Sequence, residues 1–138
     1  LTLWKRKPSA TLSSNAMWTG QNNEYMDENV QKYLYDVLNA VDEINGYFEG
    51  RPRLFEAFNL DIMLRRAVER NVEIMGEAMN RVLKEVPDVP ITDARKIVDT
   101  RNYIIHGYDR LSSEILWSII INHLPVLRRE VSALLDED

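Results

Sequence analysis

The residue types best suited to chemistry gather in one short segment of the chain. It reads Arg101-Asn102-Tyr103-Ile104-Ile105-His106-Gly107-Tyr108. Histidine titrates near neutral pH and can move protons, and His106 is one of only two histidines in the chain. Arginine presents a fixed fork of N–H donors that matches the oxygens of a phosphate. Arg101 and His106 together are therefore suited to the cleavage of a phosphodiester bond.

This pair is one group short of a complete metal-free mechanism. RNA carries its own nucleophile, the 2′-hydroxyl, so a metal-free ribonuclease needs a base, an acid and a cation for the charge of the phosphorane-like transition state. Arg101 would be the cation, but His106 is a single proton-transfer group. A two-fold dimer that brings two copies of the segment together would supply the second group. Dimerisation would then be part of the mechanism.

The spacing of the pair leaves a simpler interpretation open. Five residues on an ideal helix turn by about 140°, so Arg101 and His106 converge only if the helix ends or bends near His106. Gly107 is a typical helix terminator and makes such an end plausible. Alternatively, Arg101 pairs with an acid such as Asp99 or Glu114, and His106 merely finishes a helix.

Helical periodicity dominates the rest of the chain, and strand signals are weak. Apolar residues recur at three- and four-residue spacing, with capping or terminating residues between the stretches. The expected helices cover residues 27–48, 54–58, 60–85, 93–105 and 112–135, with caps at Asp27, at Asn59 or Asp61, at Thr92 and at Ser112 or Ser113. Pro125 should kink or split the last helix. The sequence therefore predicts a single all-α domain, an antiparallel bundle of four to five helices.

The helix over residues 60–85 is expected to be central, because its apolar residues cover more than one narrow stripe. Gly76 lies inside this helix and would let a neighbouring helix approach closely. Arg70 and Glu77 are seven residues apart and can share one face. They would either support the cleft and bind substrate or form an ordinary ion pair, and the sequence leaves both interpretations open.

Composition limits the classes of function. The net charge is −5, so nucleic acid would have to be held by a local basic patch rather than by overall charge. The absence of cysteine excludes disulfides, thiolate metal sites and cysteine nucleophiles, and is compatible with a reducing cytoplasm. No apolar run approaches the roughly 20 residues of a membrane helix, and no secretory signal is visible. We expect a cytoplasmic protein with no membrane association, no metal and no cofactor.

The first 25 residues differ from the rest of the chain. They are rich in Ser, Thr, Asn and Gly and show no sustained period. The run Ser14-Asn15-Ala16-Met17 resembles the remnant of tag cleavage before a start methionine. We interpret residues 1–16 as such a remnant rather than a natural arm, residues 1–25 as a flexible segment, and residues 26–138 as the helical domain.

The chemical segment resembles the Arg-x4-His-x-Tyr signature of the HEPN superfamily, in its HepT-like branch of ribonuclease toxins. Arg101, His106 and Tyr108 match the signature, and Asn102 fits the common Arg-Asn start. Two further stretches agree with the family: Arg70-Asn71-Val72-Glu73-Ile74-Met75-Gly76-Glu77-Ala78 is similar to its Arg-Asn-x-Glu-x-Ile/Met-Gly-Glu-Ala helix, and Leu116-Trp117 with Leu124-Pro125 is similar to its last helix. The resemblance covers approximately residues 27–135, and the order and spacing of the three stretches make it specific.

The resemblance implies an all-α homodimer that cuts RNA without metal in a cleft at the dimer interface. In such a cleft, Arg101 would stabilise phosphate charge, His106 would be the acid or base, and Asn102 would orient the site. Many family members pair with a small nucleotidyltransferase antitoxin of the MNT type, which in some pairs adds AMP to the tyrosine of the signature. Tyr108 would therefore be either this AMPylation site or a substrate contact.

Two features depart from the family pattern. Gly107 stands where the family often has a glutamate between the histidine and the tyrosine, and a glycine there could loosen the loop. The acidic overall charge argues against strong affinity for RNA. A second interpretation therefore stays open, in which the chain is a non-catalytic HEPN module that binds a nucleotidyltransferase-type partner or a nucleotide.

Overall fold

The computed structural model describes residues 27–107 and 111–136. All regular secondary structure within these two ranges is helical, as the sequence predicts. The elements are α2 (Glu28–Tyr47), α3 (Phe55–Leu60), α4 (Ile62–Glu85), α5 (Ala94–His106), α6 (Ser113–Ser118), the π-helical segment η3 (Ile119–His123) and α7 (Leu124–Leu135). The interpretation of residues 1–25 and the position of Tyr108 lie outside the described ranges.

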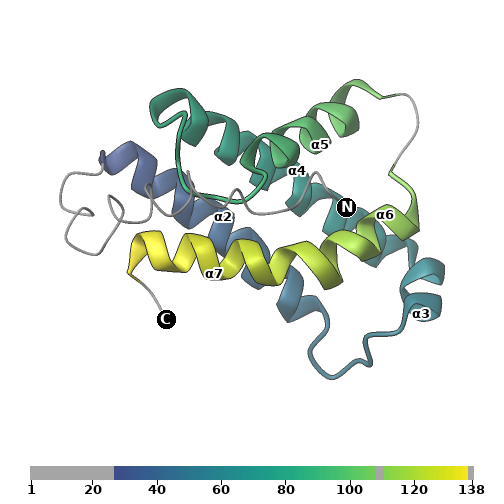
Figure 1. Cartoon of the computed structure of the whole chain (residues 1–138). Coiled ribbons are helices and arrows are strands. Elements are labelled where there is room, and N and C mark those ends of the chain that lie inside the picture. The colour runs from purple at the N-terminus through teal and green to yellow at the C-terminus, as the bar shows by residue number, and fades with distance from the viewer. Residues whose placement is uncertain (1–26, 108–110, 137–138) are drawn as a thin grey trace.

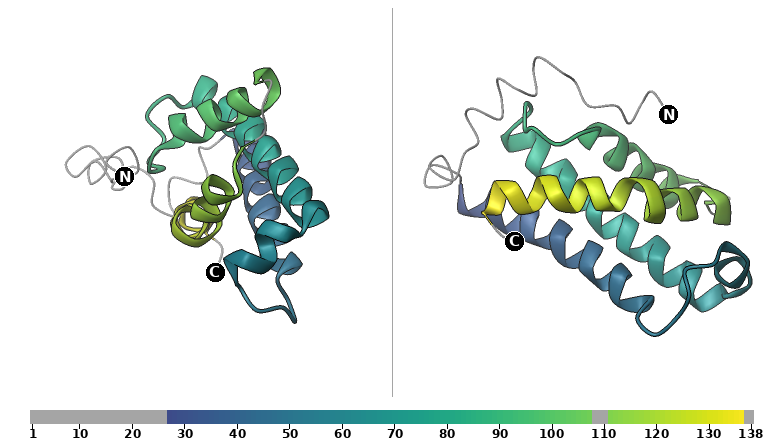
Figure 2. Two further views of the ribbon diagram at one scale, coloured as in Figure 1. Left: turned by 90° about the vertical axis from the view of Figure 1, so that its right-hand side faces the viewer. Right: turned by 60° about the horizontal axis from the view of Figure 1, so that its bottom comes forward.

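The helices form a layer with one further helix across it. The long helix α4 lies between α2 and α5, and packs against both (Figure 1). In the left view of Figure 2, α7 is seen almost along its axis, beside the layer of the other three helices. With α6, η3 and α7 forming one continuous rod, the described residues contain five helices. The predicted all-α bundle is confirmed.

The core explains why α4 is central. Helix α2 buries one apolar stripe, whereas α4 buries residues on two sides because it is covered by α2 and by α5. The most deeply buried apolar side chains of these two helices, each less than 4% exposed, are Val30, Leu34, Val37, Val41, Ile44, Val68, Val72, Met75, Met79 and Val82. Helix α5 adds Ala94, Ile97 and Val98, all from its first half. Its second half, which carries the signature, is therefore fixed mainly from one side.

Three of the predicted helix caps are present. In each, a side-chain oxygen accepts a hydrogen bond from an N–H group in the first turn, which has no partner inside the helix. The bonds run from Asn29 to Asp27 (2.6 Å), from Leu64 to Asp61 (3.0 Å) and from Ile115 to Ser112 (3.2 Å). Local sequence therefore sets the start of α2, α4 and α6.

The expected cap of α5 is wrong. The capping position belongs to Asp93, which lies in the left-handed backbone region with φ 55° and makes no capping hydrogen bond with its side chain. Thr92 is engaged elsewhere: its N–H and its hydroxyl donate to the carboxylate of Glu130 on α7, at 2.9 and 2.6 Å. Tertiary contact with a buried carboxylate has replaced the local cap and ties the start of α5 to α7.

Pro125 changes the last helix without splitting it. Proline lacks the N–H group that would continue the helical ladder. In the preceding segment η3, the N–H of Leu124 bonds the carbonyl of Ile119, five residues back, which is a wider π-type turn. The chain then continues directly into α7. The expected kink is thus taken up by a local widening of the helix.

Candidate active site and the groove beside it

Arg101 lies in α5 on the face that packs against α4. A glycine on α4 permits this close approach: a Cβ atom at Gly76 would collide with the Cβ of Arg101 and would come within 3.0 Å of the Ile97 carbonyl oxygen. The sequence predicted that Gly76 would allow a neighbouring helix to come close, and that prediction is confirmed. The result is that the arginine side chain leaves α5 directly against α4, and is only 24% exposed.

The guanidinium of Arg101 is held by two neighbours. Its Nη2 lies 2.6 Å from Oε2 of Glu77 on α4, and its Nη1 donates to Oδ1 of Asn102 at 2.9 Å. A partly buried, charge-assisted contact of this kind fixes a side chain better than an exposed one. Position along the sequence suggested Asp99 or Glu114 as examples of the acid that could pair with Arg101. The acid is instead Glu77, which was singled out as a possible supporting residue.

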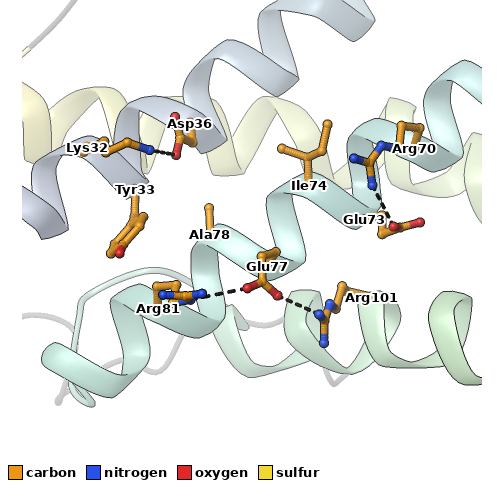
Figure 3. Close-up of a pocket in the computed structure, with 10 residues that line it drawn as sticks. All are labelled: Lys32, Tyr33, Asp36, Arg70, Glu73, Ile74, Glu77, Ala78, Arg81 and Arg101. Atoms are coloured by element: carbon orange, nitrogen blue, oxygen red, sulfur yellow. Dashed lines mark hydrogen bonds and ion pairs between the residues drawn. The ribbon is translucent and has the colours of Figure 1, made fainter.

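Glu77 also serves a second arginine. Its Oε1 lies 3.3 Å from Nε of Arg81, one helical turn further along α4. Figure 3 shows the carboxylate lying between the two guanidinium groups. Arg70 does not take part, because its Nη1 donates to Glu73 at 2.7 Å. The simple pairing of Arg70 with Glu77 is thus ruled out, although both residues line the same groove.

This groove runs between α2 and α4 and reaches Arg101 on α5, with a volume of about 410 Å3. It is lined by Lys32, Tyr33, Asp36, Arg70, Glu73, Ile74, Glu77, Ala78, Arg81 and Arg101 (Figure 3). Sequence reasoning missed Arg81 and Tyr33. Arg81 could have been found, because it stands four residues after Glu77 and so shares its face. Tyr33 could not, because it comes from another helix.

His106 is not part of this groove. It is the last residue of α5, and its side chain is exposed. Gly107 follows as the expected terminator, with φ −78° rather than a left-handed value. Because α5 stays helical up to His106, the pair keeps the roughly 140° separation of an ideal helix. One chain therefore brings Arg101, Asn102 and Glu77 together, and leaves His106 apart from them.

Two exposed apolar side chains accompany His106. Tyr103 is 51% exposed and Ile105 is 40% exposed, while Ile104 between them packs against the core. Contact of large apolar side chains with water is unfavourable, and such side chains are frequent at the centre of protein interfaces. The end of α5 thus joins a titratable side chain to an apolar surface.

The chain after the signature is fastened to α4. The N–H of Leu111 donates to Oε2 of Glu69 at 3.2 Å, and Glu69 is only 4% exposed. Nearby, Nη1 of Arg65 donates to the hydroxyl of Ser113 at 3.1 Å. Tyr108 itself lies outside the described residues. These two bonds fix the start of the second described range, just before α6, against α4.

The second histidine is a separate case. His123 lies in η3, is partly buried, and lines a small cavity with residues such as Val72 and Ile97 rather than the groove. Burial lowers its pKa, because a low-dielectric surrounding disfavours the charged ring. His123 therefore belongs to the packing of the bundle.

Residues 27–107 and 111–136 contain neither a metal-binding cluster nor a membrane-spanning helix. No cluster of three or more His, Asp or Glu side chains in these ranges could hold a metal ion. No helix among them is long and apolar enough to cross a membrane.

Comparison with known proteins gives consistent matches. The family model described as Ribonuclease HepT-like matches residues 37–134, well over half of the chain. A protein of Methanocaldococcus jannaschii, named as a candidate RNase, is 27% identical over 114 residues, covering 80% of this chain and 90% of the relative. One of Caldanaerobacter subterraneus, also named as a candidate RNase, is 33% identical over 110 residues, covering 77% and 94%. A probable ribonuclease HepT of Thermococcus cleftensis is 28% identical over 107 residues, covering 75% and 93%. No solved structure matches the chain significantly.

The helical bundle, the signature on α5 and these matches define the class of protein, a ribonuclease of the HEPN type. Within that class, the chain belongs to the HepT-like ribonuclease family. The resemblance drawn from the three sequence stretches is thereby confirmed.

Proposed function

We propose that the protein is a metal-independent endoribonuclease that works as a homodimer, with Arg101 and His106 of both chains lining one cleft. The observation that carries this is the separation of the two side chains. Arg101 is held on α4 by Glu77, whereas His106 is exposed at the end of α5 and apart from it. One chain thus offers an oriented cation and one proton-transfer group, and a second copy supplies the other.

The reaction that fits this set is an internal transesterification. One copy of His106 takes the proton of the 2′-hydroxyl, whose oxygen attacks the adjacent phosphorus. The other copy gives a proton to the departing 5′-oxygen. The products are a 2′,3′-cyclic phosphate and a 5′-hydroxyl. Arg101 stabilises the extra negative charge that builds on the phosphate oxygens, and Asn102 keeps its guanidinium oriented.

The end of α5 is the surface proposed for the dimer contact. Tyr103 and Ile105 expose apolar area beside His106. Burial of that area against a second copy would exclude water from the cleft and strengthen the electrostatic contacts inside it. An isologous contact of this kind places both copies of His106 near the two-fold axis.

We further propose that the protein is the toxin of a toxin–antitoxin pair in the cytoplasm. Its partner would be an MNT-type nucleotidyltransferase that transfers AMP from ATP to the phenolic oxygen of Tyr108 and releases pyrophosphate. The support is the resemblance to this family and the position of Tyr108 two residues after His106. A bulky anion there would block the cleft and repel RNA.

The test is RNA cleavage by the purified protein in EDTA, with the parent, His106→Ala and Arg101→Ala side by side. We expect the parent to leave 2′,3′-cyclic phosphate ends, and both variants to be inactive. Cleavage by His106→Ala at the parental rate would contradict the proposed mechanism. The fold of each variant is checked by thermal unfolding.

The acidic charge of the chain favours a second candidate function, a non-catalytic module that binds a nucleotidyltransferase-type partner or a nucleotide. This alternative predicts equal inactivity of all three proteins across tRNA, mRNA and total RNA. It also predicts that His106→Ala binds the partner as tightly as the parent does.

A further inference from the structure

The groove between α2 and α4 has features that the cleavage chemistry does not use. Its walls carry Arg81 and Tyr33, and neither residue belongs to the signature on α5. Arg101 lies at its edge on α5 and is therefore shared between the groove and the proposed cleft (Figure 3). Its volume of about 410 Å3 lies within the range of roughly 300–1,000 Å3 that is usual for small-ligand sites.

The charge of the groove is opposite to that of the chain. The chain carries a net charge of −5, but the groove is lined by four cations and three carboxylates: Lys32, Arg70, Arg81 and Arg101 against Asp36, Glu73 and Glu77. Lys32 and Arg70 each have a carboxylate of their own, at 2.9 and 2.7 Å. The surplus therefore falls on Arg81 and Arg101, which share the single carboxylate of Glu77.

Two arginines that share one carboxylate still have donors to give. A guanidinium group has several N–H donors in a planar fork. The contacts of Arg81 with Glu77, and of Arg101 with Glu77 and Asn102, use only some of them. Arg81 is exposed, so its remaining donors reach solvent in the groove. Phosphate oxygens are the natural acceptors for such a pair.

An aromatic ring stands beside this pair. The ring centroid of Tyr33 lies 5.9 Å from the guanidinium carbon of Arg81 and 5.5 Å from Nζ of Lys32. Tyr33 is half-buried and packs against the core, so the ring is held in place. Ala78 lines the groove nearby with a small side chain, which leaves room over the α4 wall. An aromatic face flanked by cations is a platform on which a nucleic-acid base stacks.

We propose that this groove binds one nucleotide of a single-stranded RNA next to the phosphate that is cut. The phosphate of that nucleotide contacts Arg81 and Arg101, and its base stacks against Tyr33. This inference rests on the proposed function through Arg101, which connects the groove to the cleavage site. A free mononucleotide offers the same chemistry, but the shared arginine favours a continuous strand. Base stacking on Tyr33 requires an unpaired base, so the groove selects single strands over duplexes.

The experiment measures binding without cleavage. A fluorescein-labelled 2′-O-methyl oligonucleotide lacks the attacking hydroxyl, so the parent protein can be titrated with it at several salt concentrations by fluorescence anisotropy. We expect Arg81→Ala to weaken binding about tenfold and to lower the slope of log K against log salt by about 0.7, the loss of one phosphate contact to a single strand. We expect Tyr33→Leu to weaken binding about tenfold with no change in slope, since stacking carries no counterion release.

Arg128→Ala is the matched control. Arg128 is also an arginine in a surface ion pair, at 2.7 Å from Asp42, but it lies outside the groove. We expect its loss to change affinity by less than about twofold. Equal weakening by Arg81→Ala and Arg128→Ala would mean that bulk charge holds the RNA, and would overturn the proposal. So would the absence of any binding by the parent.

Two further comparisons identify the ligand and separate the groove from the cleavage mechanism. AMP that binds as tightly as the oligonucleotide, with the same dependence on Arg81, would show a mononucleotide site and overturn the RNA assignment. Binding through Arg81 by a protein that never cuts RNA would keep the groove and remove the ribonuclease mechanism. If Arg81→Ala cleaved RNA at the parental rate with an unchanged KM, the ribonuclease mechanism would stand and the groove proposal would be overturned.

Discussion

Arg101 and His106 are five residues apart on one helix, yet the structure treats them differently. Arg101 is 24% exposed and is held by Glu77 across the contact with α4. His106 is exposed at the end of α5, beside two exposed apolar side chains. The difference shows that contacts between helices within one chain orient the guanidinium of Arg101, whereas the imidazole of His106 stays exposed and apart from it.

The largest expected effect is the loss of cleavage when a defective chain is substituted for or mixed with the parent. General acid–base groups and preorganised cations each contribute about 10²–10⁴-fold to rate, so His106→Ala and Arg101→Ala should each lose about 10³-fold. If one cleft needs His106 of both chains, a mixed dimer of the parent and His106→Ala lacks one proton-transfer group and is inactive. Random exchange of subunits at an equal ratio would then leave about a quarter of the cleavage shown by the same total concentration of parent, against about a half if each chain worked alone.

Mixing the parent with His106→Ala after unfolding and refolding measures this loss. The control is each protein refolded alone at the same total concentration, of which only the parent should cleave RNA. About half of the parental cleavage in a mixture shown to contain mixed dimers would contradict the shared cleft. It would mean that Arg101 and His106 of the same chain work together.

The next largest effect concerns the glycine that brings Arg101 against α4. In an ordinary helix interior, Gly→Ala stabilises by up to about 1 kcal/mol. At Gly76 the new Cβ would collide with Arg101 and crowd the carbonyl of Ile97, so we expect Gly76→Ala to lower the free energy of unfolding by about 2–3 kcal/mol. Denaturant unfolding measures it.

Gly46 provides a matched control for this change. It also lies in a helix, α2, but a Cβ atom there would meet nothing within 4 Å. We expect Gly46→Ala to be neutral or to stabilise by up to about 1 kcal/mol. Opposite signs for the two substitutions would support the close contact between α4 and α5, and equal signs would contradict it.

Much of the fold could be predicted from the sequence, because it depends on local patterns. Asp27, Asp61 and Ser112 cap helices where the periodic stretches begin, and apolar spacing identifies α4 as the central helix. Thr92 was predicted wrongly because Glu130 lies 38 residues away and competes for both of its donors. A capping rule based on neighbouring residues cannot predict an acceptor that tertiary packing brings in from a distant part of the chain.

The site divides in the same way. Arg101 and His106 were chosen as candidates from their residue types, and the role of Gly76 was predicted from its position inside a helix. The acid that holds Arg101 lies 24 residues earlier on another helix, so spacing pointed to nearer acids instead. Tyr33 joins the groove only through the packing of α2 on α4. Contacts between helices are what the sequence alone did not supply.

The ion pair that holds Arg101 can be tested by removing the charge of Glu77. Glu77→Gln keeps an oxygen acceptor for the guanidinium but removes the charge that it shares with Arg81. We expect kcat to fall about tenfold, because Arg101 is held less firmly, and KM to fall, because a negative charge leaves the groove. Steady-state cleavage of a short RNA separates the two constants.

Glu73→Gln is the control for that prediction. Glu73 lines the same groove, but it pairs with Arg70 rather than with Arg101. Glu73→Gln should lower KM as Glu77→Gln does and leave kcat within about twofold, because it removes a similar charge but leaves the ion pair between Arg101 and Glu77 intact. If both variants lower kcat alike, the role of Glu77 is one of general charge rather than of orientation.

The smallest expected effect compares the loops before and after α5. Glu130 accepts both donors of Thr92 before the helix, and Glu69 accepts the N–H of Leu111 after it. Both carboxylates are less than 9% exposed, so Glu→Gln at either should lower the free energy of unfolding by about 1–2 kcal/mol. Only the second loop follows His106, so only Glu69→Gln should also reduce cleavage, by a few fold, at temperatures where both variants are folded. Equal cleavage by the two variants would show that the end of α5 is positioned by α4 packing alone and that the loop behind it contributes nothing to the site.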